Sequence, residues 1–594
     1  MSTINKLLYL LSSREQKKAI LLLMMILVMA LLDTVGVASI LPFIAVLSNP
    51  EIVETNKILY SIYKLGNYQN DQEFFFVLGL IVFFVLFVSL TFKALTIYVQ
   101  LRFALMREYT IGKKLIEGYL HQPYSWFLDR NSSNLGRNIL SEVSNVVSGG
   151  IMPMLTLIAQ GTVAIFLITL LIFVNPIISL VVAIVLALAY TLVYWASRKY
   201  LNRIGEERLN ANQQRFNAVN EAFGASKEVK LGNLENIYLN RFSKPSQIFA
   251  RNQAIARVVE QIPRFVLEII AFGGLLIVML FLMSSGGSFA STLPIIAVYA
   301  FAGYRLLPAL QQTYASLTQL RFAGPALDAL HKDLKNLKPI QIKNNKNDIM
   351  LLKKKISLEG IYFTYPNTSK TTLNNLNIEI SANSTTGLVG VTGSGKTSTV
   401  DLILGLLEAQ QGLLKVDDKI INKNNLRSWQ KSIGYVPQKI YLIDDTINAN
   451  IAFGVEPEKI NKDAVIRAAK ISNLDKFINE DLEEGYETVV GERGARLSGG
   501  QIQRIGIARA LYHNPQVLIF DEATSALDNI TEQIIMEAVY NLGNKITIII
   551  IAHRLSTVKM CKNIYLLEDG SVRSMGNYQE LINIDKKFQE MAGE

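Results

Sequence analysis

The residues with the clearest chemistry form a glycine-rich run after an apolar stretch that reads as a strand. They are Gly390, Val391, Thr392, Gly393, Ser394, Gly395, Lys396 and Thr397, followed by Ser398. This spacing matches the phosphate-binding loop, in which a strand leads through a glycine-rich turn into a helix. The turn aims backbone amides into one concavity, and the helix N-terminus adds positive potential. We expect Lys396 to reach the terminal phosphates of a nucleotide and Thr397 to bind Mg²⁺.

A pair of acids ends a second apolar run, Val517 to Phe520. Asp521 is placed to hold Mg²⁺ through water, and Glu522 to polarise or deprotonate the water that attacks the terminal phosphate. Two solvated acids after a strand are the ordinary alternative. Their distance from the phosphate loop fits a neighbouring strand of the same sheet, and this favours the catalytic interpretation.

A third motif, LSGGQ, occupies residues 497–501 and is followed by Gln503-Arg504 and by Ala508-Arg509-Ala510-Leu511. With the phosphate loop it resembles the signature of ATP-binding cassette proteins, which ordinary phosphate-loop ATPases lack. The resemblance implies that four residues bind the nucleotide: Ser498, Gly499, Gly500 and Gln501. It also implies that the amides of Ser498 and Gly500 face a phosphate.

Further elements of the family follow in the expected order. Tyr365 resembles the aromatic residue that stacks on adenine, and Gln438 resembles the glutamine that binds Mg²⁺ near the nucleotide. Glu492 resembles the exporter-specific loop before the signature, Ser525-Ala526-Leu527-Asp528 the loop after the catalytic strand, and His553 the catalytic switch histidine. A histidine on an apolar strand is more often a core residue, and only the motif order favours the switch role.

In this family the signature faces a nucleotide held by the partner subunit, so the resemblance implies a dimer. Glu522, His553 and the signature are intact, and a homodimer would therefore have two sites competent for hydrolysis. The expected cofactors are ATP and Mg²⁺, and the expected activity is ATP hydrolysis coupled to transmembrane translocation.

The elements that must accompany this cassette are membrane helices. Half of the residues are hydrophobic and 18% are charged, but nearly all long apolar runs precede about residue 325. A span of roughly 30 Å needs about 20 helical residues. Six segments qualify, at residues 20–46, 75–99, 151–174, 177–197, 264–284 and 290–312. We predict an α-helical membrane domain at 1–325, a linker at 326–355 and an α/β cassette at 356–594.

The loops between the spans indicate the orientation. The loops between spans two and three and between spans four and five are long and basic, whereas those between three and four and between five and six are short and uncharged. Basic loops stay in the cytoplasm, so we expect both termini there, in a cell membrane that is the inner membrane of a bacterium. The apolar stretch at 19–47 is too long for a signal-peptide core and is interpreted as a retained first span.

The overall charge and the cysteine content exclude some classes. The net charge of +10 is spread over loops and helix flanks and is not gathered with aromatics in one patch, so we expect no nucleic-acid partner. One cysteine, Cys561, excludes an intramolecular disulfide framework and a cysteine-based zinc cluster.

Ionisable residues inside the spans carry the best indication of cargo, because such residues are costly in hydrocarbon unless they face a cavity or a partner. They are Asp33, Lys93, Arg264, Glu268 and Arg305. Arg264 and Glu268 are four apart and could form a structural ion pair, and Lys93 and Arg264 could snorkel from helix ends. If Lys93, Arg264 and Arg305 line one cavity, that cavity attracts an anion.

The membrane half also resembles, locally, bacterial flippases for the lipid-linked oligosaccharides of protein glycosylation. The resemblance lies around Asp33–Asn49, Lys93, Pro263-Arg264 and residues 304–308, and in a short helix expected near Ile58 to Leu65. It implies that Lys93, Arg264 and Arg305 bind the pyrophosphate of a polyprenyl carrier and that the external helix guides its tail. Lys93 stands where the flippase has arginine, which keeps the charge and loses bidentate phosphate binding.

Three functional hypotheses follow. The first is an ATP-driven exporter that flips a lipid-linked oligosaccharide or related anionic glycolipid to the outer leaflet. The second is export of peptides or amphiphilic drugs, which an apolar or anionic cavity would favour. The third is an ATP-gated regulatory membrane protein without pumping, which the presence of Glu522 disfavours.

Overall fold

The computed structural model describes residues 3–48, 53, 57–66, 71–174, 176–284, 289–337, 349–366, 368–522, 529–542, 545–552 and 554–592. These fall into two compact units. The first comprises Met1–Gln122 and Arg130–Ile340, and the second comprises Pro123–Asp129 and Gln341–Glu594. Each unit is described separately below.

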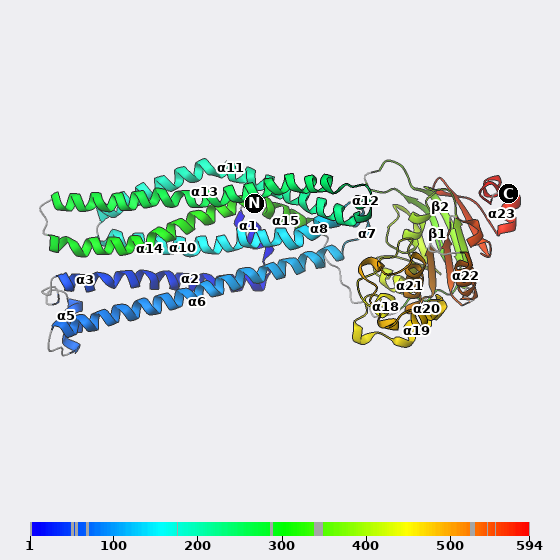
Figure 1. Cartoon of the computed structure of the whole chain (residues 1–594), viewed down its shortest axis with the longest axis horizontal. Helices are drawn as coiled ribbons and strands as arrows, with labels where there is room; N and C mark the ends of the chain where they lie inside the picture. Colours follow the sequence, from blue (N-terminus) through cyan, green and yellow to red (C-terminus); the bar gives the residue numbers. More distant parts are fainter. Residues whose placement is uncertain are drawn as a thin grey trace. The chain divides into compact units, whose positions relative to one another are not determined.

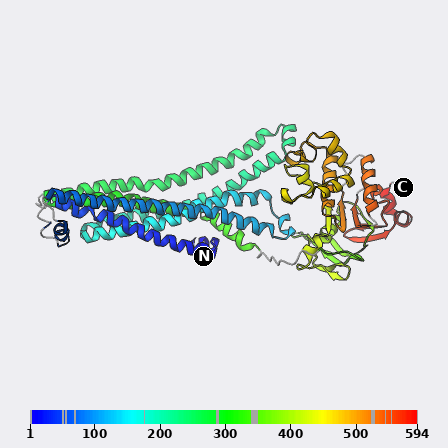
Figure 2. The same cartoon turned by 90° about the horizontal axis from the view of Figure 1, so that it is seen from below.

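The first unit is built of long helices that lie side by side (Figures 1 and 2). The helices are α1 (Thr3–Leu10), α2 (Ser13–Ala38), α3 (Ile40–Ser48), α5 (Lys57–Gly66), α6 (Asp71–Leu120), α8 (Ser132–Arg137), α9 (Val143–Val146), α10 (Met152–Val174), α11 (Pro176–Gly224), α12 (Ser226–Leu231), α13 (Glu235–Ser284), α14 (Phe289–Phe322) and α15 (Gly324–Asn336). Two π-helical turns, η1 (Asn138–Glu142) and η2 (Val147–Ile151), flank α9. The main pairings are α2 with α6, α10 with α14, and α11 with α13.

Among the described residues, four helical stretches are long and apolar enough to cross a membrane: Ser13–Leu47, Gln72–Leu120, Ser132–Val174 and Ser179–Gly224. The first three predicted spans lie inside the first three stretches, and the fourth largely coincides with the last. The predicted fifth and sixth spans fall on α13 and α14, where many side chains are outside the described set. The short connections at Asn175 and at 285–288 also lie outside the described residues.

Local signals explain where two of these helices begin, and two prolines interrupt a third. Ser12 precedes α2, and Glu15 accepts a hydrogen bond from the Ser12 backbone N–H at 2.7 Å, as in a capping box. α11 begins at Pro176, where a missing N–H costs nothing. Two prolines inside α13, Pro245 and Pro263, each remove one intrahelical hydrogen bond.

The short helix expected near Ile58 to Leu65 is α5. Its Leu59 is buried in a cluster with Val46 and Phe74, and Tyr63 contacts the Phe74 ring edge-on with centroids 5.2 Å apart. These contacts bury apolar side chains of α5 against α3 and α6. The expected short helix is therefore present and is packed within the first unit.

The second unit contains two sheets. A four-stranded antiparallel sheet has the order β2-β1-β4-β5, and a six-stranded sheet has the order β10-β9-β3-β8-β7-β6, parallel except for β10. The strands are β1 (Lys355–Phe363), β2 (Leu373–Ser381), β3 (Thr385–Val389), β4 (Gln411–Val416), β5 (Lys419–Ile420), β6 (Ile433–Val436), β7 (Val517–Asp521), β8 (Thr547–Ile551), β9 (Asn563–Glu568) and β10 (Ser571–Gly576).

The second unit also contains helices (Figure 1). They are α7 (Tyr124–Leu128), α16 (Lys396–Ile403), α17 (Leu426–Gln430), α18 (Ile447–Ile451), α19 (Lys462–Ile471), α20 (Asp475–Asp481), α21 (Gly499–Tyr512), α22 (Asn529–Leu542), α23 (Tyr578–Ile584) and α24 (Lys586–Ala592). Short 3₁₀ turns are η3 (Pro457–Lys459), η4 (Gly485–Glu487), η5 (Glu492–Gly494) and η6 (Leu555–Val558).

The centre of the larger sheet explains the continuous apolar runs in the sequence. All five residues of β7 and all five of β8 are buried, as expected for parallel strands covered on both faces. β8 pairs with β3 on one side and with β7 on the other. The acidic pair therefore lies on the second strand from the phosphate loop. The sequence-based expectation of a neighbouring strand was wrong by one position, because strand order is a property of tertiary packing.

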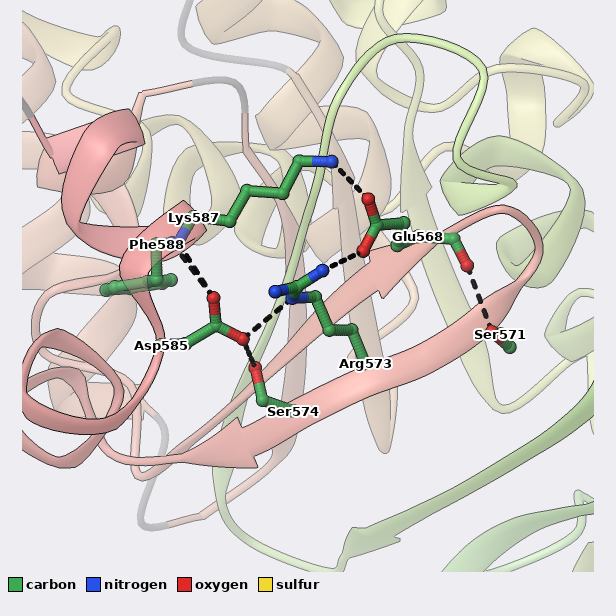
Figure 3. A network of polar contacts seen from close by, with 7 residues as sticks. All are labelled: Glu568, Ser571, Arg573, Ser574, Asp585, Lys587 and Phe588. Atoms are coloured by element: carbon green, nitrogen blue, oxygen red, sulfur yellow. Dashed lines mark hydrogen bonds and ion pairs between the residues drawn. The ribbon is translucent and has the colours of Figure 1, made fainter.

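A polar network closes the C-terminal end of this unit (Figure 3). Arg573 Nε donates to Asp585 Oδ2 at 3.0 Å, and Ser574 Oγ donates to the same oxygen at 2.8 Å. Glu568 accepts hydrogen bonds from Arg573 and Lys587. The network joins β9 and β10 to the start of α24.

We expect Asp585→Asn to lower the melting temperature of the purified chain by roughly 2–4 °C. Burial acts to raise the pKa of Asp585, but hydrogen bonds from Ser574, Arg573 and two backbone amides outweigh it, so the pKa lies below its usual value of 3.8. The charged form therefore stabilises the fold above this value, and the contribution is lost as the pH falls through the lower folded-state pKa. Thermal unfolding should give the same difference at about pH 7 and about pH 4.5. A difference that shrinks well above pH 3.8 would contradict this assignment.

Candidate nucleotide site and membrane charge cluster

The predicted phosphate loop joins β3 to α16, as its pattern requires. Gly390, Gly393 and Gly395 have positive φ values of 152°, 85° and 99°. A Cβ on Gly390 would collide with the carbonyl oxygen of Leu567, and one on Gly395 would lie 2.6 Å from Leu373 Cδ2. Nothing lies within 4 Å of a Cβ built on Gly393. The loop is therefore tightly held at both ends and open at its middle.

Lys396 is only 5% exposed, and its ammonium group bonds to the loop itself. Nζ donates to the carbonyl oxygens of Gly390 at 2.8 Å and Val391 at 3.1 Å. Burial lowers the pKa of Lys396, while the nearby carboxylates of Glu522 and Asp521 act to raise it. The loop lysine and the acidic pair therefore share one electrostatic environment, although β8 separates their strands.

The loop fits the phosphates of a nucleotide. Lys396 is a buried cation held by neutral carbonyls, and Ser394 Oγ is buried with no hydrogen-bond partner among the described residues. Thr397 is exposed at the first turn of α16, beside the helix N-terminus. This donor set suits an anion, and oxygen atoms from Thr397, Gln438 and Asp521 are of the kind that Mg²⁺ prefers.

The acidic pair lies at the end of β7, where each acid contacts a polar side chain. Asp521 is 7% exposed and accepts a hydrogen bond from Tyr435 Oη at 3.1 Å. Gln438 Nε2 donates to Glu522 Oε2 at 2.6 Å, and Glu522 adopts a left-handed φ of 53°. Gln438 and Glu522, which the sequence analysis assigned to one site, are therefore in direct contact. A non-glycine residue in this conformation is strained, which is frequent at functional positions.

The predicted adenine-stacking residue, Tyr365, stands beside the phosphate-loop helix. Its hydroxyl lies 2.9 Å from Ser398 Oγ, and its ring contacts Phe363 edge-on with centroids 4.9 Å apart. Tyr365 is thus tied to α16 next to Lys396 and Thr397. Stacking on adenine stays a prediction.

The signature residues begin α21. Ser498 caps this helix: Oγ accepts a hydrogen bond from the backbone N–H of Gln501 at 3.3 Å, and Gln501 Oε1 accepts one from the backbone N–H of Ser498 at 2.7 Å. Ser498 and Gly499 are exposed, while the rest of α21 is largely buried. The helix therefore presents its N-terminus, whose free backbone amides favour anions, to solvent. His553 and Ser525–Asp528 lie outside the described residues, and Glu492 lies in η5.

The structure adds residues that the sequence analysis did not assign. Burial and the nearby charge of Asp521 raise the pKa of Asp401, on α16, to about 6. Burial, followed by the charges of Asp401 and Tyr365, raises the pKa of Tyr124, on α7. Tyr124 lies on α7, in the segment Pro123–Asp129 that belongs to the second unit. Periodicity could not reveal this placement, because it depends on long-range contacts.

Two of the predicted cargo residues meet at one carboxylate in the first unit. Lys93 Nζ on α6 lies 2.8 Å from Asp33 Oδ2 on α2, and Arg305 Nη1 on α14 bonds to Asp33 Oδ1. Arg264 instead pairs with Glu268 one turn along α13, with Nε 2.9 Å from Oε1, and is exposed. The described contacts thus bring Lys93 and Arg305 together and place Arg264 in the alternative ion pair.

Comparison with known proteins gives a matching family model for each of the two units. The family model described as the ABC transporter transmembrane region matches residues 18–304, and the model described as ABC transporter matches residues 373–525. ABC transporter B family member 29 of Arabidopsis thaliana, a chloroplastic protein, is 32% identical over 518 residues, which are 84% of this chain and 80% of that protein. An ATP-dependent lipid A-core flippase of Saccharophagus degradans is 30% identical over 478 residues, 80% of this chain and 79% of that protein. A bacterial Atm1-family ABC exporter with ATP bound shares the fold, with a TM-score of 0.78 at 22% identity over 98% of both chains.

A helical transmembrane region followed by an α/β cassette with these motifs defines a transport ATPase of the exporter type. The chain belongs to the ABC transporter family, as a half-transporter with one transmembrane region and one nucleotide-binding domain. It is a multi-pass membrane protein that uses ATP with Mg²⁺ and couples ATP hydrolysis to transport.

Proposed function

We propose that this exporter flips a lipid-linked oligosaccharide or a related anionic glycolipid to the outer leaflet of a bacterial inner membrane. The observation that carries the proposal is the convergence of Lys93 and Arg305 within the membrane-spanning helices. Two cations on different helices share one carboxylate, so the three side chains together keep a net positive charge in an apolar region. An anionic headgroup would complement that charge. Relatives named lipid A-core flippases support a glycolipid cargo.

The proposed pump is a homodimer with both termini in the cytoplasm. The exposed signature of one subunit would face the phosphate loop of its partner. Each of the two composite sites would contain Lys396 and Glu522 of one subunit and the signature residues of the other. Residues 390–398, Tyr365 and Gln438 bind the nucleotide in this proposal, with Thr397, Gln438 and Asp521 as Mg²⁺ ligands and Glu522 and His553 in hydrolysis. The basic loops support the orientation.

The test measures ATPase activity of the purified chain in phosphatidylcholine vesicles, with and without a polyprenyl-pyrophosphate glycan. We expect the lipid to stimulate hydrolysis and Arg305→Ala to raise the half-saturating lipid concentration by ~10-fold or more, because a charge-assisted contact is lost. Arg203→Ala removes the same side chain from an exposed pair with Glu207 and serves as the matched control.

If no anionic lipid stimulates the wild-type chain while cationic amphiphiles or peptides do, the cargo is of the peptide or drug class. ATP hydrolysis with no translocation of any of these probes would favour the regulatory alternative.

A further inference from the structure

Asp33 is the common partner of both cations in the membrane cluster, and it is almost completely enclosed. Its side chain is 1% exposed, whereas those of Lys93 and Arg305 are 25% and 17% exposed. Ser89 Oγ also donates to Asp33 Oδ1, at 3.4 Å. The carboxylate is thus held on α2 behind the two cations, which keep part of their surface open.

The charges of this cluster do not balance. One carboxylate faces one ammonium and one guanidinium group, so the cluster carries a net charge of +1. No other ion pair to Lys93 or Arg305 occurs among the residues that the structure describes. A residual charge inside a membrane span is costly, and membrane proteins keep such groups mainly where they serve ions or substrates. A second buried carboxylate would have neutralised the cluster at the same place.

From this imbalance we propose that Asp33 is a resident counter-ion that sets the charge of the cargo site. It cancels one of the two cations and leaves one positive charge per subunit, or two in the proposed homodimer. A pyrophosphate diester carries one ionised oxygen on each phosphate, so its two charges match those of the dimer. The inference rests on the proposed function and adds a residue that determines specificity for headgroup charge.

A counter-ion at this site would also help a pump to release its cargo. With Asp33 neutral, four positive charges would surround a dianion in a region of low dielectric constant, where attraction is strong. Cargo would then bind tightly and leave slowly. With Asp33 charged, the two cations are already positioned before cargo arrives, which lowers the cost of ordering them. Asp33 therefore acts as a positioning residue that balances capture against release.

The test is a series of variants in which the net charge of the cluster changes while its position in the membrane helices stays the same. Arg305→Gln gives a cluster charge of 0, the wild type +1, Asp33→Asn +2, and the double variant Asp33→Asn/Arg305→Gln returns to +1. The probes are polyprenyl-pyrophosphoryl-N-acetylglucosamine, with two charges, and the matching polyprenyl-phosphoryl sugar, with one, in phosphatidylcholine vesicles. The readout is the concentration of each lipid that half-maximally stimulates ATP hydrolysis, together with the maximal rate.

We expect the half-saturating concentration of the pyrophosphate lipid to fall as the net charge of the cluster rises. Arg305→Gln should raise it ~10-fold, and Asp33→Asn should lower it ~10-fold while also lowering the maximal rate, because release slows. The double variant should lie within about threefold of the wild type. Preference for the pyrophosphate lipid over the phosphate lipid should rise with cluster charge. Lys459→Gln, which removes an exposed charge from the second unit, should change none of these values.

A purely structural ion pair would give a different pattern. Every variant would then lose thermal stability, and the double variant would not regain the wild-type half-saturation; this result would overturn the inference and leave the proposed function standing. If Asp33→Asn fails to fold, the double variant compared with Arg305→Gln still decides, because only the counter-ion account predicts recovery. A wild-type chain that responds to neither phosphate lipid would overturn both proposals.

Discussion

Replacing Glu522 with glutamine is expected to lower ATP turnover by roughly 10²–10⁴-fold while ATP binding stays within about threefold of the wild type. Glu522 directly follows β7, next to Asp521, and it accepts a hydrogen bond from Gln438 at 2.6 Å. A carboxylate at this position can accept a proton from an attacking water, whereas a carboxamide of the same shape cannot. The binding contacts of the phosphate loop are untouched, so hydrolysis and binding should separate.

Phosphate release and equilibrium nucleotide binding measure the two effects. Glu537→Gln makes the same chemical change on the exposed face of α22 and should leave turnover unaltered. Turnover of Glu522→Gln within threefold of the wild type would assign the base to another residue.

Lys396→Ala is expected to weaken ATP binding by ~10–100-fold, the amount that corresponds to the loss of a charge-assisted hydrogen bond. The ammonium group is buried and is held only by the carbonyl oxygens of Gly390 and Val391 in the described contacts. These neutral partners leave its charge available for a phosphate group. Removing the charge also leaves Asp521 and Glu522 without their nearby cation, so the remaining site repels anions more strongly.

Nucleotide titration of the full chain measures this loss. Lys419→Ala, an exposed lysine on β5, controls for the change in total charge. ATP affinity of Lys396→Ala equal to that of the control would contradict the phosphate-loop assignment. Unfolding temperatures in the absence of nucleotide distinguish a binding defect from a folding defect.

The phosphate loop and the acidic pair could be predicted from the sequence because their chemistry is tied to local geometry. The backbone has positive φ at Gly393 and Gly395, which favours glycine there, and a continuous apolar run marks the buried strand that ends at Asp521. The insertion of β8 between β3 and β7 could not be predicted, since motif spacing along the chain carries no information about strand order.

The membrane cluster was predictable only in part. The sequence identifies Asp33, Lys93 and Arg305 as ionisable residues in apolar segments, and their cost in hydrocarbon indicates that they must find partners. The packing of α2, α6 and α14 decides which of these residues pair. The ion pair of Arg264 could be recognised in the sequence, because Glu268 lies four residues away on the same helix face. Local pairs can be predicted from periodicity, whereas pairs between helices cannot.

ATP-driven flipping of an anionic glycolipid is measured most directly as translocation in sealed proteoliposomes. A fluorescent polyprenyl-pyrophosphoryl sugar is placed in both leaflets, and a membrane-impermeant quencher reports its distribution after ATP is added outside to molecules whose nucleotide-binding domains face outward. We predict net movement of the lipid into the inner leaflet with ATP, and none with Glu522→Gln or without ATP. ATP hydrolysis at full rate without any change in the lipid distribution would contradict the account.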